Sequence, residues 1–432
     1  MNGLHKILFK AGQRWRNPSL AGHYAFLKRS EGWSREQLID YQWEKLLETI
    51  HYAWEHSAFY RQKWTEAGVH PGDIKTPEDV RKIPVVSKQE LIHHNAEVHS
   101  DEHFGRKFYA VTSGTTGESL SFWKDENADS FNRAAIFRGY SWYGVEPWEF
   151  NGYFWGFSFG FLQRIKTRVL DWLVNRYRLF SYSHGDLARF ARKMQHARYL
   201  EGYSSAIYQT AKLILERDLP RPAGLKLVKG TSEKIYPHYH EATLAAFGQP
   251  VRSEYGAAES GVIAFECPEG HMHIVTEGVY VEEENGQIIV TNLVMRSFPV
   301  VRYALGDYIR LKPADFRCAC GMEHPVIEEV TGRVGTTVYG KTGIYPSLYF
   351  YYVFKNLNKN HGIKLSYQVV QPEKGYLVFR LEPKLSEAER KALATEINAL
   401  FKGDVEYELR EGEVLFPEGR TGKFRDFISE VE

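Results

Sequence analysis

Residues 111–119 read "VTSGTTGES", a run made almost entirely of threonine, serine and glycine. Apolar segments typical of strands flank it at 107–111 ("KFYAV") and 119–123 ("SLSFW"). Glycine permits sharp backbone turns, and the amides and hydroxyls of such a loop can surround the oxygens of a phosphate group. The common P-loop is excluded, because its glycines are farther apart and Glu118 stands where that motif has lysine. Taken alone, the stretch is either a phosphate-binding loop or a plain polar turn.

The composition is that of a globular protein. The chain has 432 residues, 43% of them hydrophobic and 15% aromatic, which predicts two or three domains with sizeable cores. A net charge of +1 gives no support for a nucleic-acid partner. No apolar run is long enough for a membrane span, and the N-terminal apolar stretch is too short for a signal peptide. Three cysteines, an odd number, argue against a disulfide framework, so a cytoplasmic protein is expected.

The first hundred residues are expected to form a largely helical arm. Capping boxes, in which a serine and a residue three positions later satisfy free backbone amides, occur at 34–37 ("SREQ") and 87–90 ("SKQE"). Apolar residues after the first box recur every three or four positions and predict one buried helix face, made of Ile39, Trp43, Leu46, Ile50 and Ala53.

Strands and helices alternate from about residue 105 onward. The segments 225–230 ("LKLVKG") and 249–256 ("QPVRSEYG") read as strands that end in loops, and 238–247 between them reads as a helix. The dipeptide Asn285-Gly286 predicts the turn of a β-hairpin. This alternation predicts an α/β fold with ligand-binding loops at strand ends.

The character of the sequence changes after residue 333. The elements expected there are a hairpin, a capped helix and a strand, at 367–383, 386–401 and 404–411. Together they predict a small α+β unit. We therefore expect a large domain at 1–333, of which 1–100 is the helical arm, and a small domain at 334–432.

Further polar clusters occur farther along the chain, and each has two readings. In 253–260 ("SEYGAAES"), Tyr255 offers a ring for stacking and Glu259 an oxygen ligand for Mg²⁺, but a surface loop is the plainer reading. Asp307 follows an apolar strand, where a carboxylate can accept from ribose hydroxyls or simply occupy a β-turn. Lys423 lies in a glycine-flanked stretch near the C-terminus, either as a mobile catalytic group or as a solvated lysine.

Taken together and in this order, the clusters resemble the adenylate-forming superfamily of acyl-CoA synthetases and related ligases. The nearest resemblance is to phenylacetate-CoA ligase and its relatives in capsular polysaccharide biosynthesis. Segments 46–91, 199–214 ("YLEGYSSAIYQTAKLI") and 229–235 ("KGTSEKI") are also similar to that branch. The resemblance covers essentially the whole chain. It implies a large α/β N-terminal domain with mixed sheets and helices, and a small, mobile α+β C-terminal domain.

The resemblance also implies roles for individual residues. ATP phosphates would be held by Thr112, Ser113, Gly114, Thr115, Thr116 and Gly117. The adenine would lie beside Ser232, Glu233, Tyr255 and Gly256. Asp307 would accept from the ribose hydroxyls with Arg333 nearby, Glu259 would bind Mg²⁺, and Lys423 would enter the site for adenylation. The implied cofactors are ATP and Mg²⁺, with CoA as a possible second substrate.

The implied reaction joins a small carboxylic acid to AMP, releases pyrophosphate and passes the acyl group to an acceptor. The acceptor is CoA in one reading and an amine in the other, which would make the protein an amide ligase. A non-catalytic binding protein is disfavoured, because Lys423, Glu259 and Asp307 are all present. Two departures from the pattern bear on the acceptor: Ala258 precedes Glu259 where a hydroxyl residue is usual, and no acidic hinge residue follows Arg333. The oligomeric state is not specified.

All three cysteines fit one structural zinc site. Cys267, Cys318 and Cys320, together with His273, make a Cys₃His set suited to tetrahedral Zn²⁺. His271 is the reserve ligand. Three unligated thiols in a reducing compartment are the alternative.

Two stretches have weaker readings. The aromatic residues of 140–182 either line an acid pocket or belong to an ordinary core. Within 161–180, cationic and apolar residues alternate, which favours a packed amphipathic helix with a solvated basic face over contact with a membrane.

Overall fold

The computed structural model of the protein describes residues 2–112, 119–154, 161–179, 183–333, 337–413, 415 and 424–431. The side chains of residues 2, 161–164, 332, 333, 346 and 348 are not among the described parts. The sequence-predicted site residues that lie outside the described residues are Ser113, Gly114, Thr115, Thr116, Gly117 and Lys423.

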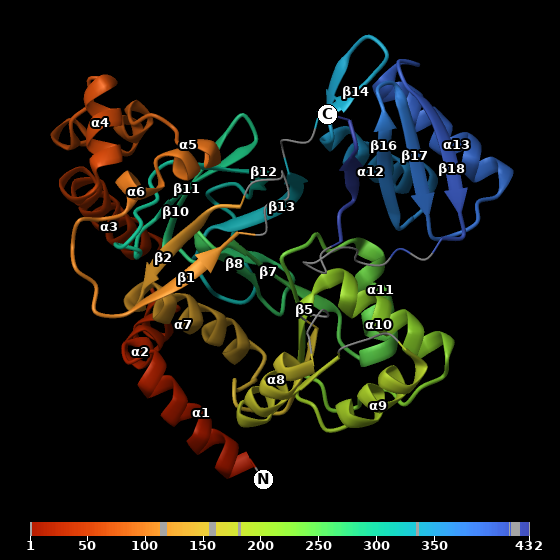
Figure 1. Ribbon diagram of the computed structural model, residues 1–432, viewed down its shortest axis with the longest axis horizontal. Coiled ribbons are helices and arrows are strands. Elements are labelled where there is room, and N and C mark those ends of the chain that lie inside the picture. Colours follow the sequence, from red (N-terminus) through yellow and green to blue (C-terminus); the bar gives the residue numbers. More distant parts are fainter. Residues whose placement is uncertain are drawn as a thin grey trace.

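The N-terminal region is helical, as expected, and forms the red and orange part of Figure 1. Its elements are α1 (Asn2–Arg16), α2 (Leu20–Ser30), α3 (Arg35–His56), α4 (Ala58–Glu66), η1 (Pro71–Asp73), η2 (Pro77–Lys82), α5 (Lys88–His93) and α6 (Asn95–Val98). Both predicted capping boxes are confirmed, at Ser34 and Ser87. The prediction for Ile39 is wrong, since this side chain is 55% exposed while its neighbour Leu38 is buried. The buried stripe of α3 is therefore displaced by one residue at its start.

The described part of the chain contains an 11-stranded sheet in the order β10-β11-β12-β13-β9-β8-β7-β6-β5-β3-β4. Its strands are β3 (Asn151–Phe154), β4 (Arg176–Arg178), β5 (Tyr199–Tyr203), β6 (Leu227–Thr231), β7 (Val251–Ala257), β8 (Gly261–Glu266), β9 (Met272–Ile274), β10 (Val279–Glu284), β11 (Gln287–Asn292), β12 (Tyr303–Leu311) and β13 (Val326–Arg333). Neighbours from β4 to β7 are parallel, and neighbours from β7 to β10 are antiparallel. The predicted hairpin turn at Asn285 is confirmed, because it joins β10 to β11.

Helices cover both faces of the parallel half of the sheet. They are α7 (Glu126–Trp142), α8 (Phe161–Leu173), α9 (His184–Met194), α10 (Ser204–Glu216) and α11 (Pro237–Phe247). One face packs on α9, α10 and α11 through a large apolar core, and the other packs on α7. Gly139 allows the close approach of α7, since a Cβ there would lie 2.6 Å from the ring of Phe265. Chain segments β5–α10–β6–α11–β7 thus build the α/β unit that the sequence predicts.

Residues from 337 onward pack around a core of their own, drawn in blue in Figure 1. The elements are β14 (Thr337–Tyr339), β15 (Ile344–Pro346), α12 (Leu348–His361), β16 (Tyr367–Glu373), β17 (Tyr376–Leu381), α13 (Glu387–Phe401), β18 (Glu406–Glu411) and β19 (Phe427–Ser429). The sheet order is β18-β17-β16-β19, and the predicted hairpin and capped helix are confirmed as β16–β17 and α13.

Polar contacts join this C-terminal part to the helices beside it. Glu382 accepts hydrogen bonds from Tyr208 (3.2 Å), Gln209 (2.6 Å) and Lys212 (3.3 Å) of α10. Ser366 and the Nε2 atom of His238 are 2.7 Å apart. Hydrogen bonds and charges therefore make up much of this junction.

The helix predicted within 161–180 forms as α8, but it is not packed in the expected way. Its apolar side chains Ile165, Val169, Leu170 and Trp172 are all exposed. Among the helices that the structure describes, none is both long and apolar enough to cross a bilayer.

Candidate active site and metal centre

A cavity of about 2630 Å³ lies between the central sheet, α7 and the C-terminal elements. Among the residues that line it are seven of the sequence-predicted site residues: Thr112, Ser232, Glu233, Tyr255, Gly256, Glu259 and Asp307. The structure therefore brings together residues that are nearly 200 positions apart in the chain.

Thr112 closes the base of the loop that the sequence predicts to bind phosphate. The loop connects β1 (Lys107–Val111) to β2 (Ser121–Asp125), two antiparallel strands. The amide of Thr112 donates to the carbonyl oxygen of Leu120 (2.8 Å), and its Oγ1 accepts from the Leu120 amide (3.0 Å). Thr112 thus fixes the two ends of the loop at the cavity wall.

Tyr255 and Asp307 form a pair, with the tyrosine hydroxyl donating to Asp307 Oδ2 over 2.7 Å. Asp307 lies inside β12 and not at the end of a strand, so that detail of the prediction is wrong. The strand is irregular here, because Gly306 has a positive φ (86°) and the register with β13 shifts between Tyr308 and Ile309. Arg333 lies directly opposite Asp307 on β13, which agrees with the expected proximity of the two residues.

Glu259 lies in the tight turn between β7 and β8 and is only 5% exposed, so the surface-loop reading is wrong. Tyr303 donates its hydroxyl to Glu259 Oε1 (3.0 Å). The second oxygen, Oε2, is buried and has no hydrogen-bond partner among the described residues. An unpaired buried carboxylate oxygen is costly, which makes this position suitable for a cation such as Mg²⁺.

Glu233 connects the loop after β6 to the C-terminal segment. Its Oε2 accepts from the amide of Ser205, in the first turn of α10, over 2.8 Å. Its Oε1 accepts from the amide of Phe424 over 2.5 Å. Because Phe424 follows Lys423 directly, this contact brings the chain next to that lysine to the cavity. The neighbouring Ser232 has a positive φ of 67°.

Lys234 is a cavity residue that the sequence interpretation missed. Burial lowers the pKa of its ammonium group to about 8. Its Nζ donates to the carbonyl oxygen of Thr331 (3.2 Å) and lies 3.5 Å from the centre of the Tyr351 ring. Lys234 follows the predicted site residue Glu233 in the chain, which indicates that it lies near the site. Nothing in the sequence indicates that its pKa is lowered.

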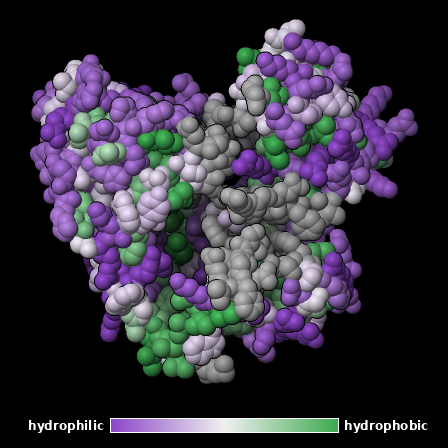
Figure 2. All heavy atoms as spheres, in the orientation of Figure 1, coloured by the Kyte–Doolittle hydropathy of each residue, from purple (hydrophilic) through white to green (hydrophobic). Residues whose placement is uncertain are grey.

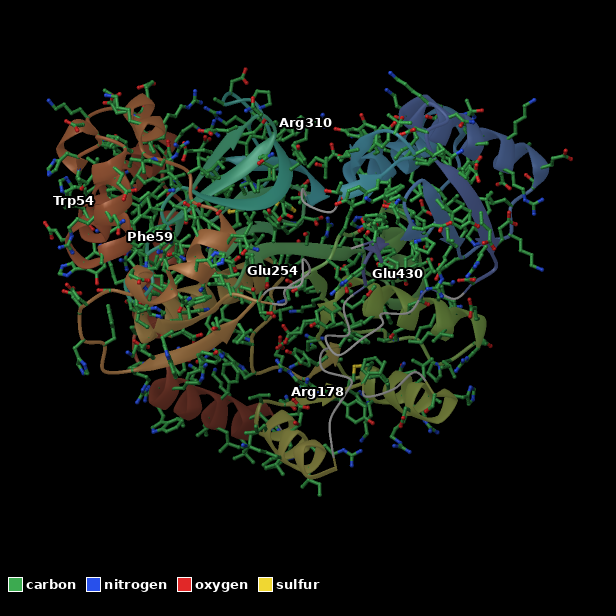
Figure 3. All side chains as sticks on the ribbon, turned by 45° about the horizontal axis from the view of Figure 1, so that its top comes forward. Trp54, Phe59, Arg178, Glu254, Arg310 and Glu430 are labelled. Atoms are coloured by element: carbon green, nitrogen blue, oxygen red, sulfur yellow. The ribbon has the colours of Figure 1, made fainter. Side chains whose placement is uncertain are left out.

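A row of charged side chains across the parallel strands was also missed. Register pairs Glu201 on β5 with Lys229 on β6, and Lys229 Nζ lies 3.3 Å from Glu201 and 2.6 Å from Glu254. Arg176 on β4 lies 2.7 Å from Glu201. Burial opposes protonation of Lys229, but the two carboxylates outweigh it and raise the lysine pKa. Glu254, labelled in Figure 3, comes from the same strand as Tyr255. The signal available in the sequence was a single charged residue in each of the largely buried strands β5 and β6.

The aromatic segment divides between the two readings given to it. Tyr140 and Tyr153 line the cavity, whereas Phe154 packs into the apolar core beneath α9. Residues 155–160 and 180–182 lie outside the described residues.

The predicted metal ligands converge on one point. The ligand atoms of Cys267, His273, Cys318 and Cys320 all lie within 4.8 Å of one another. Cys267 follows β8, His273 lies in β9, and the other two cysteines lie between β12 and β13. The reserve residue His271 is also close, with its Nδ1 atom 3.3 Å from Cys318 Sγ. A soft, compact Cys₃His set of this kind fits Zn²⁺.

A buried chain of hydrogen bonds, absent from the sequence interpretation, orients His273. Its Nδ1 is 3.1 Å from the carbonyl oxygen of His324, which can only accept, so Nδ1 carries the proton and Nε2 faces Cys320 at 3.2 Å. The ring of His324 lies 2.9 Å from Glu277, and Glu277 pairs with Arg138 at 2.6 Å. Metal-binding histidines usually have such outer support.

Comparison with known proteins gives partial sequence matches. No protein-family model matches the chain. It is 23% identical to Protein CapK of Staphylococcus aureus over 294 residues, which is 64% of this chain and 63% of that protein. It is 40% identical to Phenylacetate-coenzyme A ligase of Escherichia coli (strain K12) over 58 residues, 13% of each chain. The alignments thus span less than two thirds of the length of these relatives.

The structural comparison covers nearly the whole chain. A crystal structure of 2-Hydroxyisobutyryl-CoA Ligase in the postadenylation state with R3-HIB-AMP gives a TM-score of 0.70 at 20% identity, over 93% of this chain and 92% of that one. The same ligase with 2-HIB-AMP and CoA in the thioesterification state gives a TM-score of 0.58 at 21% identity, over 94% and 92%. These matches confirm the predicted fold. The chain therefore has the fold of the adenylate-forming ligases, with acyl-CoA ligases as its structural neighbours.

Proposed function

We propose that the protein is an ATP-dependent carboxylic acid ligase that forms an acyl-AMP, releases pyrophosphate and transfers the acyl group to CoA. The observation that carries the proposal is the convergence of Glu233, Tyr255, Glu259 and Asp307 on one cavity. The match to a phenylacetate-CoA ligase and the fold shared with a ligase that holds an acyl-AMP support the same reaction.

The proposed site residues divide the work of adenylation. In this step a carboxylate oxygen bonds to the α-phosphorus of ATP while the bond to pyrophosphate breaks, although both reactants are anions. Tyr255 and Asp307 would position the adenine and ribose, and the 112–117 loop would donate to the phosphates. Lys423 would offset the charge that develops as pyrophosphate leaves. A Mg²⁺ ion held by Glu259 would neutralise phosphate charge.

The domain division belongs to the proposal as well. Residues 1–333 would bind ATP and the acid, and residues 334–432 would form a small mobile domain carrying Lys423. The separate apolar core of the C-terminal elements supports this division. The hydrogen bond between Glu233 and Phe424 supports an arrangement suited to adenylation, because it holds the segment next to Lys423 against the cavity.

We also assign a structural Zn²⁺ to Cys267, His273, Cys318 and Cys320. Four protein ligands leave no open position on the metal, so the ion would hold three chain segments together and would not activate water. Elemental analysis of protein purified without a metal-affinity tag should find about one zinc per chain.

Acid-dependent exchange of pyrophosphate into ATP tests the first step. A panel of aryl, fatty, amino and sugar acids should contain at least one acid that drives exchange, and Lys423→Ala should abolish it while the protein stays folded. Exchange that persists in Lys423→Ala would remove that residue from the mechanism. No exchange with any acid of the panel would contradict the proposed activity.

The acceptor is tested with the acid that the panel identifies. Incubation with ATP and CoA should give a thioester detectable by mass spectrometry. The absence of an acidic residue after Arg333 favours one alternative, an amide ligase. Acyl-AMP that persists with CoA but is consumed by an amine would establish that alternative.

A further inference from the structure

Two helices that are distant in sequence, α1 and α8, lie side by side at one edge of the molecule. The rings of His5 on α1 and Trp172 on α8 are 5.6 Å apart. On the inner side of α1, Phe9 packs against Trp148, with ring centres 6.2 Å apart. Residues of both helices also line the cavity, so this edge borders the proposed active site.

The outward sides of the two helices are apolar. Half of the exposed large hydrophobic side chains found among the described residues belong to the two helices, namely Leu4, Ile7, Trp15, Ile165, Val169, Leu170 and Trp172, here called the α1–α8 surface. Trp15 and Leu170 lie where this surface meets the cavity. Their exposed fractions run from 47% for Ile165 to 76% for Trp15. Figure 2 shows the corresponding hydrophobic area at the lower edge of the molecule, where α1 and α8 lie in Figure 1. Contiguous exposed apolar surface of this kind marks an interaction site.

The apolar positions form stripes with helical spacing. Ile165, Val169 and Trp172 follow one another at four and three positions, and so share one side of α8. On α1, Leu4 and Trp15 lie on one side, opposite the inward Phe9, because eleven residues make close to three full turns. Each helix therefore presents an apolar stripe away from the protein core.

The charges around these stripes are of one sign. Exposed cationic side chains flank them: Arg14 on α1, and Lys166 and Arg168 on α8. Lys6 and Lys10 lie on the inner side of α1, each 5.1 Å from the centre of the Trp148 ring. No acidic residue occurs in α1. The one acidic residue of α8, Asp171, is 6% exposed and pairs with Arg178 at 2.9 Å. An occupant of this surface must therefore offer apolar area and negative charge together.

We propose that the α1–α8 surface docks onto a bilayer that contains anionic lipids, with α1 and α8 lying in the interface between headgroups and acyl chains. Amphipathic helices bind in this orientation when a cationic border meets anionic headgroups and the apolar stripe enters the acyl region. Long lysine and arginine side chains can reach up to the headgroups from such a position. A second copy of the chain fits less well, because a two-fold contact would bring the cationic borders together.

Sedimentation with lipid vesicles tests the proposal on the full chain. Vesicles of phosphatidylcholine mixed with phosphatidylglycerol should carry the protein into the pellet, and vesicles of phosphatidylcholine alone should carry much less. The double variant Arg14→Gln/Lys166→Gln should bind the anionic vesicles about thirtyfold more weakly. Each cation near an anionic surface contributes about 1 kcal/mol to binding, and a loss of about 2 kcal/mol corresponds to this factor.

The apolar contribution is tested with a matched pair of double variants. Ile7→Asp/Val169→Asp should abolish binding to anionic vesicles, whereas Ile39→Asp/Ile344→Asp, at side chains exposed elsewhere on the molecule, should leave it intact. Unchanged circular dichroism and acid-dependent exchange would show that both variants are folded.

Three results would overturn the proposal. The first is that the native chain does not bind anionic vesicles. The second is that Ile7→Asp/Val169→Asp and Ile39→Asp/Ile344→Asp bind them equally well. The third is that the native chain self-associates without binding vesicles, and that this self-association disappears in Ile7→Asp/Val169→Asp. The last result would identify a second copy as the occupant.

Discussion

The change Glu277→Gln should reveal how strongly the metal centre depends on its outer support. The side chains of Glu277 and Arg138 are 0% and 2% exposed, and their contact is 2.6 Å. Burial opposes ionisation of Glu277, but Arg138 and His324 outweigh it and hold the Glu277 pKa below its ordinary value. Removing the carboxylate leaves the Arg138 guanidinium buried without a counter-charge. Such a change costs about 3–5 kcal/mol of unfolding free energy.

Urea unfolding followed by tryptophan fluorescence measures this loss. Trp142 lies under Arg138, with 5.8 Å between the guanidinium and the ring centre, and it is one of ten tryptophans whose emission follows the unfolding of the chain. A loss of 3–5 kcal/mol should lower the midpoint by about 1 M urea. The double variant Glu277→Leu/Arg138→Met should lose much less than the two single variants together, because it leaves no buried charge unpaired.

Zinc affinity should fall with the same substitution. The carbonyl oxygen of His324 fixes the ring of His273, and the ring of His324 is held by Glu277. Loss of a direct outer partner of a metal-binding histidine typically costs about 10–100-fold in affinity. Glu277 acts through His324, so the loss of affinity should lie at the lower end of that range. A Glu277→Gln protein within 1 kcal/mol of the native stability, with unchanged zinc affinity, would refute this account of the centre.

Other substitutions test the remaining features. Asp307→Ala should weaken ATP binding measured by calorimetry, and Glu259→Gln should raise the Mg²⁺ concentration needed for exchange; an unchanged value would contradict the role of the residue concerned. Cys318→Ser should lose both zinc and thermal stability, whereas a metal-free native protein of equal stability would refute the zinc site. Burial lowers the pKa of His238 to about 4, so the unfolded chain takes up the proton first as the pH falls. The contribution of His238 to stability should therefore fall between about pH 6.5 and pH 4 by at most about 3 kcal/mol, and His238→Asn should show a slope that is shallower by that amount.

Local signals in the sequence predicted most of the regular elements. A capping box depends on residues three positions apart, so Ser34, Ser87 and Ser386 could be assigned without knowledge of the fold. The same holds for the hairpin turn at Asn285. The metal set could be predicted because the chain has only three cysteines, and the structure places all three thiols close to His273.

Features that depend on strand register and on packing between distant segments could not be predicted. The pairing of Lys229 with Glu201 and Glu254 needs three strands to align. The contact between Arg138 and Glu277 joins residues 139 positions apart. Helical spacing showed that α8 has an apolar side, but the direction in which that side faces depends on how α8 packs against the sheet and α1.

The junction at Glu382 has a thermodynamic consequence for any opening of the molecule. Its contacts to Tyr208, Gln209 and Lys212 are polar, as is the contact between Ser366 and His238. Separation of the C-terminal part from α10 would therefore hydrate mainly polar groups, and polar hydration adds no positive heat capacity. The equilibrium for such opening should also shift with ionic strength, because salt weakens the attraction between Lys212 and Glu382, which lie 3.3 Å apart.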